Sequence, residues 1–147
     1  MSAVIMSSVT TDVRAARRLT TVTRVLLGLI FFVMGLNGFL FFLPPPASMP
    51  KGAMDFSVAL VGTGYMMPLV MGTQVVSGAL LLANRYVPLA LAVLAPVIVN
   101  IVALHAFLMP SGLPMAGVVF ALELYLAWSY RAVYRSMLAA RVSPAAQ

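Results

Sequence analysis

Two ionisable side chains, those of Glu123 and His105, lie inside long apolar stretches of the sequence, where ionisable groups are rare. Both can take up or release a proton, and both can hydrogen-bond the polar head of a small molecule. A carboxylate at the centre of a bilayer costs about 2.5–3.5 kcal/mol on insertion scales. Glu123 should therefore face the protein interior, where we expect a neutral acid that donates a hydrogen bond. The pair predicts a binding or proton-handling site within a membrane.

Three amide side chains occupy comparable positions: Asn37 and Gln74 lie in two further apolar stretches, and Asn100 lies in the same stretch as His105. With about 1.5 Å of rise per residue, all five polar residues lie roughly 6–15 Å below the outer ends of their helices. They are expected to form one polar layer in the outer half of the bilayer. Gln74 and Asn100 are the expected partners of Glu123. His105 lies closer to the surface and is expected to line the opening of the site.

The same polar residues could instead form a structural network that fastens the helices together. Hydrogen bonds between membrane helices stabilise by about 0.6 kcal/mol each on average, so packing could account for one or two of the residues. The chain has no cysteine, and His105 is its only histidine. Thiolate metal sites, iron–sulfur ligation and bis-histidine haem within one copy are therefore excluded. No metal-ligand set and no nucleophile–base pair can be named, so an enzyme acting alone is not predicted.

Four apolar runs must position these residues. Each is about 19–23 residues long, enough for a helix to cross a hydrocarbon layer of about 30 Å. Hydrophobic residues make up 63% of the chain and charged residues 8%, which is typical of membrane proteins. The sequence therefore predicts an all-α fold, an antiparallel bundle of four transmembrane helices. The runs are residues 25–43, 65–83, 87–109 and 113–134.

The basic residues predict the orientation of this bundle. Of nine, only Lys51 lies in the connection between the first and second runs. The other eight precede the first run, occupy the turn between the second and third, or lie at and beyond the end of the fourth. Because basic segments stay in the cytoplasm, both termini are expected inside. The net charge of +6 thus reflects topology, and no nucleic-acid partner is predicted.

The sequence also predicts where the segments outside the four runs lie. Residues 1–23 are expected to be cytoplasmic, either as a short helix on the membrane surface or as a frayed tail. Residues 44–64 form a long outer loop, in which residues 53–61 could form an interfacial helix. Residues 135–147 are a cytoplasmic tail. The first run is longer than the apolar core of a signal peptide, about 7–15 residues, and is expected to be an uncleaved anchor.

Several short motifs resemble those of DoxX-type small membrane proteins. They comprise residues 24–31, 35–39, 63–69, 78–82 and 84–91, followed by Ala95-Pro96, Asn100 and His105. Their order and spacing, over about residues 22–138, carry the resemblance. It implies a four-helix bundle of the bacterial inner membrane. Some relatives are linked to thiosulfate:quinone oxidoreduction or to redox complexes, and most have no known activity. Many members carry an acidic residue where Gln74 stands, so this chain has one carboxylate fewer.

These observations favour a multi-pass protein of the bacterial cytoplasmic membrane that acts as a subunit or binding module. It would hold a small lipophilic ligand, a quinone or a lipid, in a polar pocket of the outer leaflet. Redox centres would sit on a partner protein, and no covalent cofactor is expected. The chain could also form a homo-oligomer through its small-residue helix faces. Two alternatives stay open: a small proton-coupled transporter and a purely structural membrane scaffold.

Overall fold

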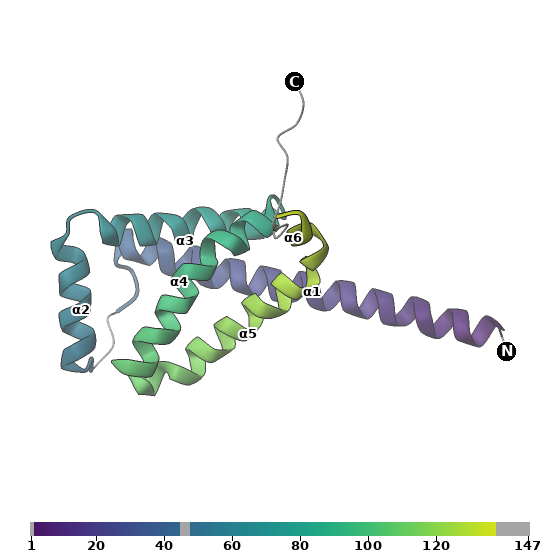
Figure 1. Ribbon diagram of the computed structural model, residues 1–147, viewed down its shortest axis with the longest axis horizontal. Helices are drawn as coiled ribbons and strands as arrows, with labels where there is room; N and C mark the ends of the chain where they lie inside the picture. Colours follow the sequence, from purple (N-terminus) through teal and green to yellow (C-terminus); the bar gives the residue numbers. More distant parts are fainter. Residues whose placement is uncertain (1, 45–47, 138–147) are drawn as a thin grey trace, which may run out of the picture.

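The protein is helical throughout the part that the structure describes. The computed structural model describes the backbone of residues 2–44 and 48–137, and the side chains of residues 14–44 and 48–135. No strand occurs in these residues, so the all-α prediction is confirmed. The elements, shown in Figure 1, are α1 (Ser2–Leu40), α2 (Lys51–Gly62), α3 (Met66–Leu82), α4 (Val87–Phe107), the 3₁₀ turn η1 (Pro110–Gly112), α5 (Leu113–Ser129) and α6 (Arg131–Met137).

Several of these helices are long and apolar enough to cross a membrane. Three described segments meet both conditions by themselves: Arg14–Leu40, Val87–Phe107 and Pro110–Ser129. α3 has only 17 residues, about 25 Å of helix. It reaches the length of a span only together with α2, from which it is bent by 93°. The described chain therefore has three candidate spans, or four if the bent pair forms one.

The ends of the helices differ from the predicted runs, for local reasons. α1 ends at Leu40 because Phe41 takes a left-handed backbone conformation, with φ 51°. The side chain of Asn37 then accepts a hydrogen bond from the N–H of Leu43, at 2.7 Å. At its other end α1 begins at Ser2, so no break separates the polar N-terminal residues from the first apolar run. The fourth run also divides, since α5 ends at Ser129 and the short α6 follows.

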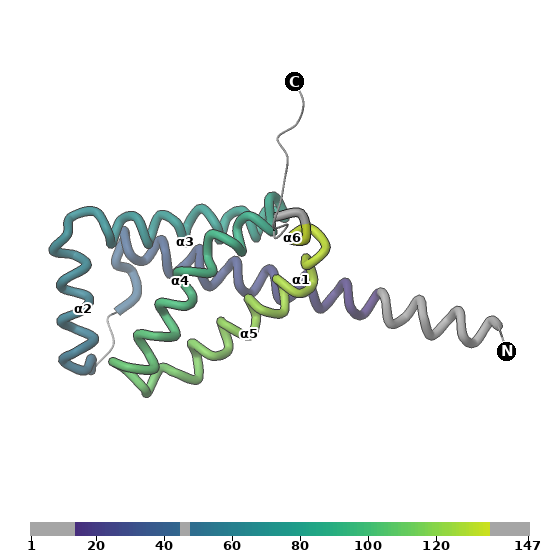
Figure 2. The backbone as a smooth tube through the Cα atoms, in the orientation of Figure 1, coloured from purple at the N-terminus to yellow at the C-terminus, as the bar shows by residue number. Residues whose placement is uncertain are grey.

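Four of the helices pack around one apolar core. α1 and α4 each lie against both α3 and α5. The core takes side chains from all four, among them Phe31, Leu81, Leu94 and Leu126. The tube in Figure 2 shows α4 and α5 as a hairpin inclined to α1 and α3, with α2 across the end of the molecule that also carries η1.

α1 and α3 approach most closely where glycines meet. A Cβ atom on Gly78 would lie 2.6 Å from the backbone nitrogen of Phe32. One on Gly35 would lie 2.8 Å from the backbone nitrogen of Val75. Such distances leave no room for a side chain, so the two backbones touch through these glycines.

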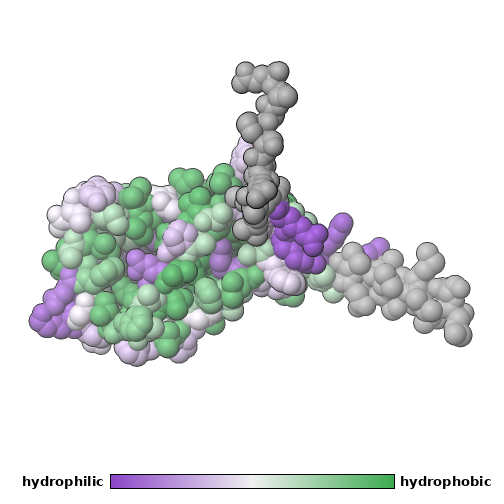
Figure 3. Space-filling view, in the orientation of Figure 1, coloured by the Kyte–Doolittle hydropathy of each residue, from purple (hydrophilic) through white to green (hydrophobic). Residues whose placement is uncertain are grey.

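The surface is mostly apolar. Figure 3 shows hydrophobic side chains over most of the visible helical body, with strongly hydrophilic ones mainly toward its two ends. Large apolar side chains such as Leu69, Val99 and Phe107 are exposed. A water-soluble protein rarely exposes so much contiguous apolar surface, whereas a lipid-facing surface requires it.

Tyr134 holds α6 against the first turn of α4. Its hydroxyl donates to the carbonyl oxygen of Pro88 at 2.7 Å. Burial raises the pKa of this hydroxyl to about 12, and a charged Glu123 raises it in the same direction. Because the pKa rises on folding, the stabilisation linked to this proton is complete below the ordinary value of 10.0. It is lost as the pH rises through the folded value.

We expect Tyr134→Phe to lower the free energy of unfolding by about 1 kcal/mol near pH 7, the usual contribution of one such hydrogen bond. Titration with sodium dodecyl sulfate, followed by circular dichroism, measures the change. Tyr65→Phe is the matched control, since Tyr65 is exposed and its hydroxyl makes no hydrogen bond among the described residues. Equal losses in both variants would contradict the assigned role of the Tyr134 hydroxyl.

Candidate functional site

The carboxyl group of Glu123 lies in the interior of the protein. Glu123 shares the inward face of α5 with Ala116, Val119 and Leu126, at the three- and four-residue spacing of one helix face. Its side chain is 5% exposed, and its Oε2 atom is fully buried. No group in the described part of the chain donates a hydrogen bond to Oε2. A buried polar atom without a hydrogen-bond partner destabilises the fold by about 1–3 kcal/mol. Such atoms are rare in native proteins, so Glu123 is an unusual residue for this apolar core.

Two more polar side chains are buried on α3. Gln74 is 6% and Ser77 2% exposed, and their spacing of three residues places them on one face. Gln74 lies about 12 Å along α3 and Glu123 about 15 Å along α5, counted from the end near α2 and η1. The two side chains therefore lie at similar distances along their helices from this end. No hydrogen bond joins them in the described residues.

Asn100 does not face the interior, and the expectation that it partners Glu123 is wrong. The buried positions of α4 include Leu91, Leu94 and Ile98. Asn100 lies two residues beyond Ile98, which is about 200° around the helix. Asn100 is accordingly exposed on the outer side of α4. The predicted inward direction of the Asn100 side chain is therefore wrong.

His105 lies near the end of α4, apart from Glu123. It is seven residues beyond Ile98 and so on the inward face, but about 10 Å nearer the end that carries η1. Its Nδ1 lies 2.7 Å from the carbonyl oxygen of Ile101, which fixes Nδ1 as the protonated nitrogen in this contact. The ring packs against Gly112 in η1. The structure therefore gives His105 a place beside the α4–α5 connection and no hydrogen bond to Glu123 within the described residues.

Asn37 is engaged at the end of its own helix. Its Oδ1 atom accepts the N–H of Leu43, as described above. This contact closes the C-terminal turn of α1 and leaves the side chain only partly buried. Of the five predicted site residues, the structure thus brings Gln74 and Glu123 into the core, together with Ser77.

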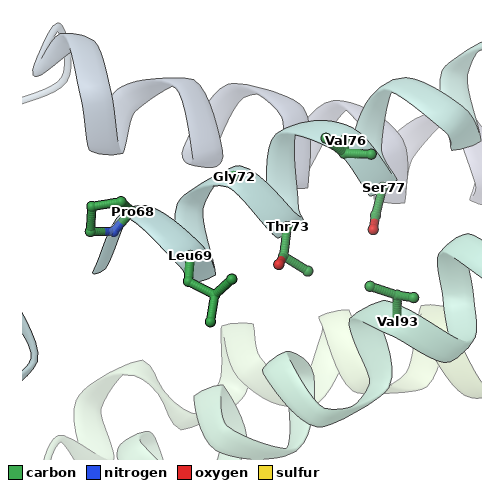
Figure 4. A pocket seen from close by; sticks show the side chains of 7 residues that line it. All are labelled: Pro68, Leu69, Gly72, Thr73, Val76, Ser77 and Val93. Atoms are coloured by element: carbon green, nitrogen blue, oxygen red, sulfur yellow. The ribbon is translucent and has the colours of Figure 1, made fainter. Parts of the chain in front are cut away.

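A groove between α3 and α4 adds residues that the sequence analysis did not single out. Its volume is about 320 Å³, and Thr73, Ser77 and Val93 are among its lining residues. In Figure 4 the side chains of Ser77 and Val93 point toward one another across it, and the Thr73 hydroxyl also points into the space. Gln74 and Glu123 do not line the groove. Ser77 is both buried and part of the lining, so it marks where the groove meets the interior polar residues.

The sequence contains a weak signal for these hydroxyls. Thr73, Gln74 and Ser77 stand within five residues of an otherwise apolar helix. Hydroxyls in membrane helices often bond their own backbone, so their types alone do not indicate a site. In the described residues no group of three or more His, Asp or Glu side chains could hold a metal ion.

No protein-family model, curated protein or solved structure matches the chain. The resemblance to DoxX-type proteins therefore depends on the sequence motifs alone.

Proposed function

We propose that this chain is a DoxX-like, multi-pass protein of the bacterial cytoplasmic membrane that binds a small lipophilic ligand of the quinone class. It would act as a non-catalytic subunit or binding module beside a redox partner protein. α1, the bent α2–α3 pair, α4 and α5 would be its four spans, with both termini in the cytoplasm. The end with α2 and η1 would then face the periplasm. The observation that carries the proposal is the buried carboxyl of Glu123 with an unpartnered oxygen.

The lack of pairing argues against a purely structural role. A network that fastened the helices would join its members by hydrogen bonds, because that is how buried polar groups stabilise a membrane bundle. Within the described residues, no hydrogen bond joins any two of Asn37, Gln74, Asn100, His105 and Glu123. An unpartnered carboxyl lowers stability, and a ligand that supplies the missing partner would offset this loss.

A quinone-type head suits this carboxyl chemically. A neutral carboxylic acid can donate to a quinone carbonyl, and a carboxylate can accept from the hydroxyl of the reduced form. Gln74 and Ser77 offer further donors and acceptors at similar depth. The α3–α4 groove supplies an apolar approach from the lipid, with hydroxyls of Thr73 and Ser77 along it. The groove is small for a ligand site, about 320 Å³, and Glu123 does not line it, so the ligand head would have to extend beyond the groove to reach the carboxyl.

The proposal is tested by equilibrium binding of decylubiquinone and its reduced form to the purified protein in lipid nanodiscs. We expect Glu123→Gln to weaken binding about tenfold or more, because one hydrogen bond to a charged or acidic group contributes roughly 1.5–3 kcal/mol. Ser77→Ala should weaken it less. Asn100→Ala is the matched control, a polar residue at comparable depth on the outer side of α4.

Unchanged affinity in Glu123→Gln, or an equal loss in Asn100→Ala, would overturn the assignment. A flux of protons driven by a solute gradient in proteoliposomes, abolished by Glu123→Gln without any quinone binding, would favour the transporter instead.

A further inference from the structure

A second cavity lies at the opposite end of the helices from α2 and η1. Its volume is about 670 Å³, it is open to the surroundings, and it is lined by α1, the α3–α4 turn and the junction of α5 with α6. Three arginines line it, Arg17 and Arg24 from α1 and Arg131 from the start of α6. None of its lining residues is acidic. Three positive groups thus surround one space with no counter-charge of their own.

Arg24 is the most deeply placed of the three. It is 8% exposed, an unusual burial for an arginine. Its Nη1 donates to the carbonyl oxygen of Leu81 and lies 3.4 Å from that of Leu82, in the last turn of α3. Both contacts use Nη1, which leaves the N–H groups of Nε and Nη2 for a ligand. The guanidinium is therefore held in position before any ligand arrives.

The other walls of the cavity are also fixed by contacts. Arg131 donates from Nη1 to the carbonyl oxygen of Trp128 at 3.0 Å and lies 4.9 Å from the centre of its ring. The Thr20 hydroxyl donates to the carbonyl of Ala16, so the Tyr125 hydroxyl must be the donor in its 3.2 Å contact with Thr20. These contacts join α1 to α5 at the rim and preform a basic pocket.

We propose that this pocket binds the phosphate of an anionic phospholipid. A phosphate offers several acceptor oxygens, and arginine forks match them better than any other side chain. The positive-inside rule accounts for arginines at this end of the protein, but not for three around one cavity with a buried member. Basic pockets between membrane helices are a recognised way to hold anionic headgroups. This inference uses none of the residues of the proposed quinone site and does not depend on it.

The apolar surroundings indicate a lipid and not free phosphate. Trp128 lines the pocket and is 68% exposed. Leu124 precedes it by one turn on the same face of α5 and is exposed as well. On α1, Val25 and Leu29 continue the line that Thr21 starts at the pocket. Acyl chains could lie along these two apolar lines while the phosphate stays among the arginines.

Trp128 is the only tryptophan of the chain, so tryptophan fluorescence reports on lipid that contacts the rim of this pocket. The experiment reconstitutes the full-length protein in dioleoylphosphatidylcholine vesicles. Dibromo-acyl phosphatidylglycerol or dibromo-acyl phosphatidylcholine is then titrated in at equal mole fractions. Bromine quenches tryptophan on contact, so the two curves give the relative affinity of the Trp128 site for the anionic lipid. We expect the brominated phosphatidylglycerol to quench at a several-fold lower mole fraction than the brominated phosphatidylcholine.

A matched pair of variants separates the pocket from general surface charge. Arg17 lines the pocket, whereas Arg18 lies on another face of the same helix, beside Arg14 and Leu19. Arg17→Gln should reduce the preference for phosphatidylglycerol about fivefold, the equivalent of about 1 kcal/mol per arginine. Arg18→Gln removes the same charge and should leave most of the preference. Arg17 has the advantage that its side chain makes no hydrogen bond in the described residues, so its loss should not disturb the fold.

Each remaining outcome overturns the proposal. Equal quenching by the two brominated lipids in the unmodified protein would show that the pocket does not select an anionic headgroup. If Arg17→Gln and Arg18→Gln lose the preference for phosphatidylglycerol equally, general surface charge and not the pocket would account for that preference. If about 10 mM inorganic phosphate abolishes the preference while the same ionic strength of chloride does not, the pocket is a site for soluble phosphate.

Discussion

Replacing Glu123 by leucine is expected to stabilise the ligand-free protein while it abolishes quinone binding. The carboxyl has an oxygen that is buried without a hydrogen-bond partner, and its neighbours on α5 are Val119 and Leu126. Removing such a group and filling its volume with an apolar side chain should raise the free energy of unfolding by about 1–3 kcal/mol. Decylubiquinone binding should fall below detection. Sodium dodecyl sulfate titration measures the first change, and nanodisc binding measures the second.

The expected gain in stability together with the expected loss of binding distinguishes the proposed ligand site from a purely structural role for Glu123. If Glu123 fastened helices together, Glu123→Leu would lower stability, and any loss of binding would follow from unfolding. Gln74→Leu is the matched comparison, a polar residue of α3 at similar depth and similar burial. A destabilised Glu123→Leu that still binds quinone would contradict both halves of the prediction. A protein that gains stability by losing a residue usually keeps that residue for function.

Replacing Gly78 by alanine is expected to destabilise the protein strongly, although it adds only one methyl group. The new Cβ would lie 2.6 Å from the nitrogen of Phe32 and 2.9 Å from the carbonyl oxygen of Gly28. Both atoms are backbone, so neither can rotate away as a side chain could. The two helices would have to separate, and overpacking of this kind costs about 1–3 kcal/mol, occasionally more. We expect a loss of about 3 kcal/mol in the same detergent titration.

Gly72 provides the control for this prediction. It stands on the same helix, and a Cβ on it would have no atom within 4 Å. Alanine in a helix is favoured over glycine by about 0.8–1.0 kcal/mol, so Gly72→Ala should be neutral or slightly stabilising. Equal losses in Gly72→Ala and Gly78→Ala would mean that helix propensity, and not contact with α1, determines the effect. Gly117→Ala on α5, also free of neighbours, should behave like Gly72→Ala.

Prediction from the sequence succeeded where one physical preference dominates. Long apolar runs form helices because a segment without water must satisfy every backbone polar group internally. The all-helical class of the fold and a break close to the predicted one, at residues 63–65 between α2 and α3, follow from this preference and from the glycines. The positions of Glu123 and Gln74 along their helices also follow, because they depend only on the helical rise.

The sequence of such an apolar run does not determine how the helix is rotated about its axis. α4 is apolar on every side, so its sequence does not indicate whether Asn100 or His105 faces inward. The sequence also does not indicate which glycines of α3 contact α1: a Cβ on Gly78 would meet the backbone of α1, whereas one on Gly72 would have no atom within 4 Å. Contacts between helices decide these questions, as where Gly78 of α3 lies against the backbone of α1.

The sequence by itself determined that the chain is helical, that its helices are apolar enough for a membrane and that its arginines cluster near particular helix ends. Only the tertiary structure decided that Glu123 stays unpartnered in the core and that Arg17, Arg24 and Arg131 surround one cavity. The physical reason is distance along the chain. Composition and the helical rise per residue describe a single helix. Whether these residues contact one another depends on how segments up to about a hundred residues apart pack together.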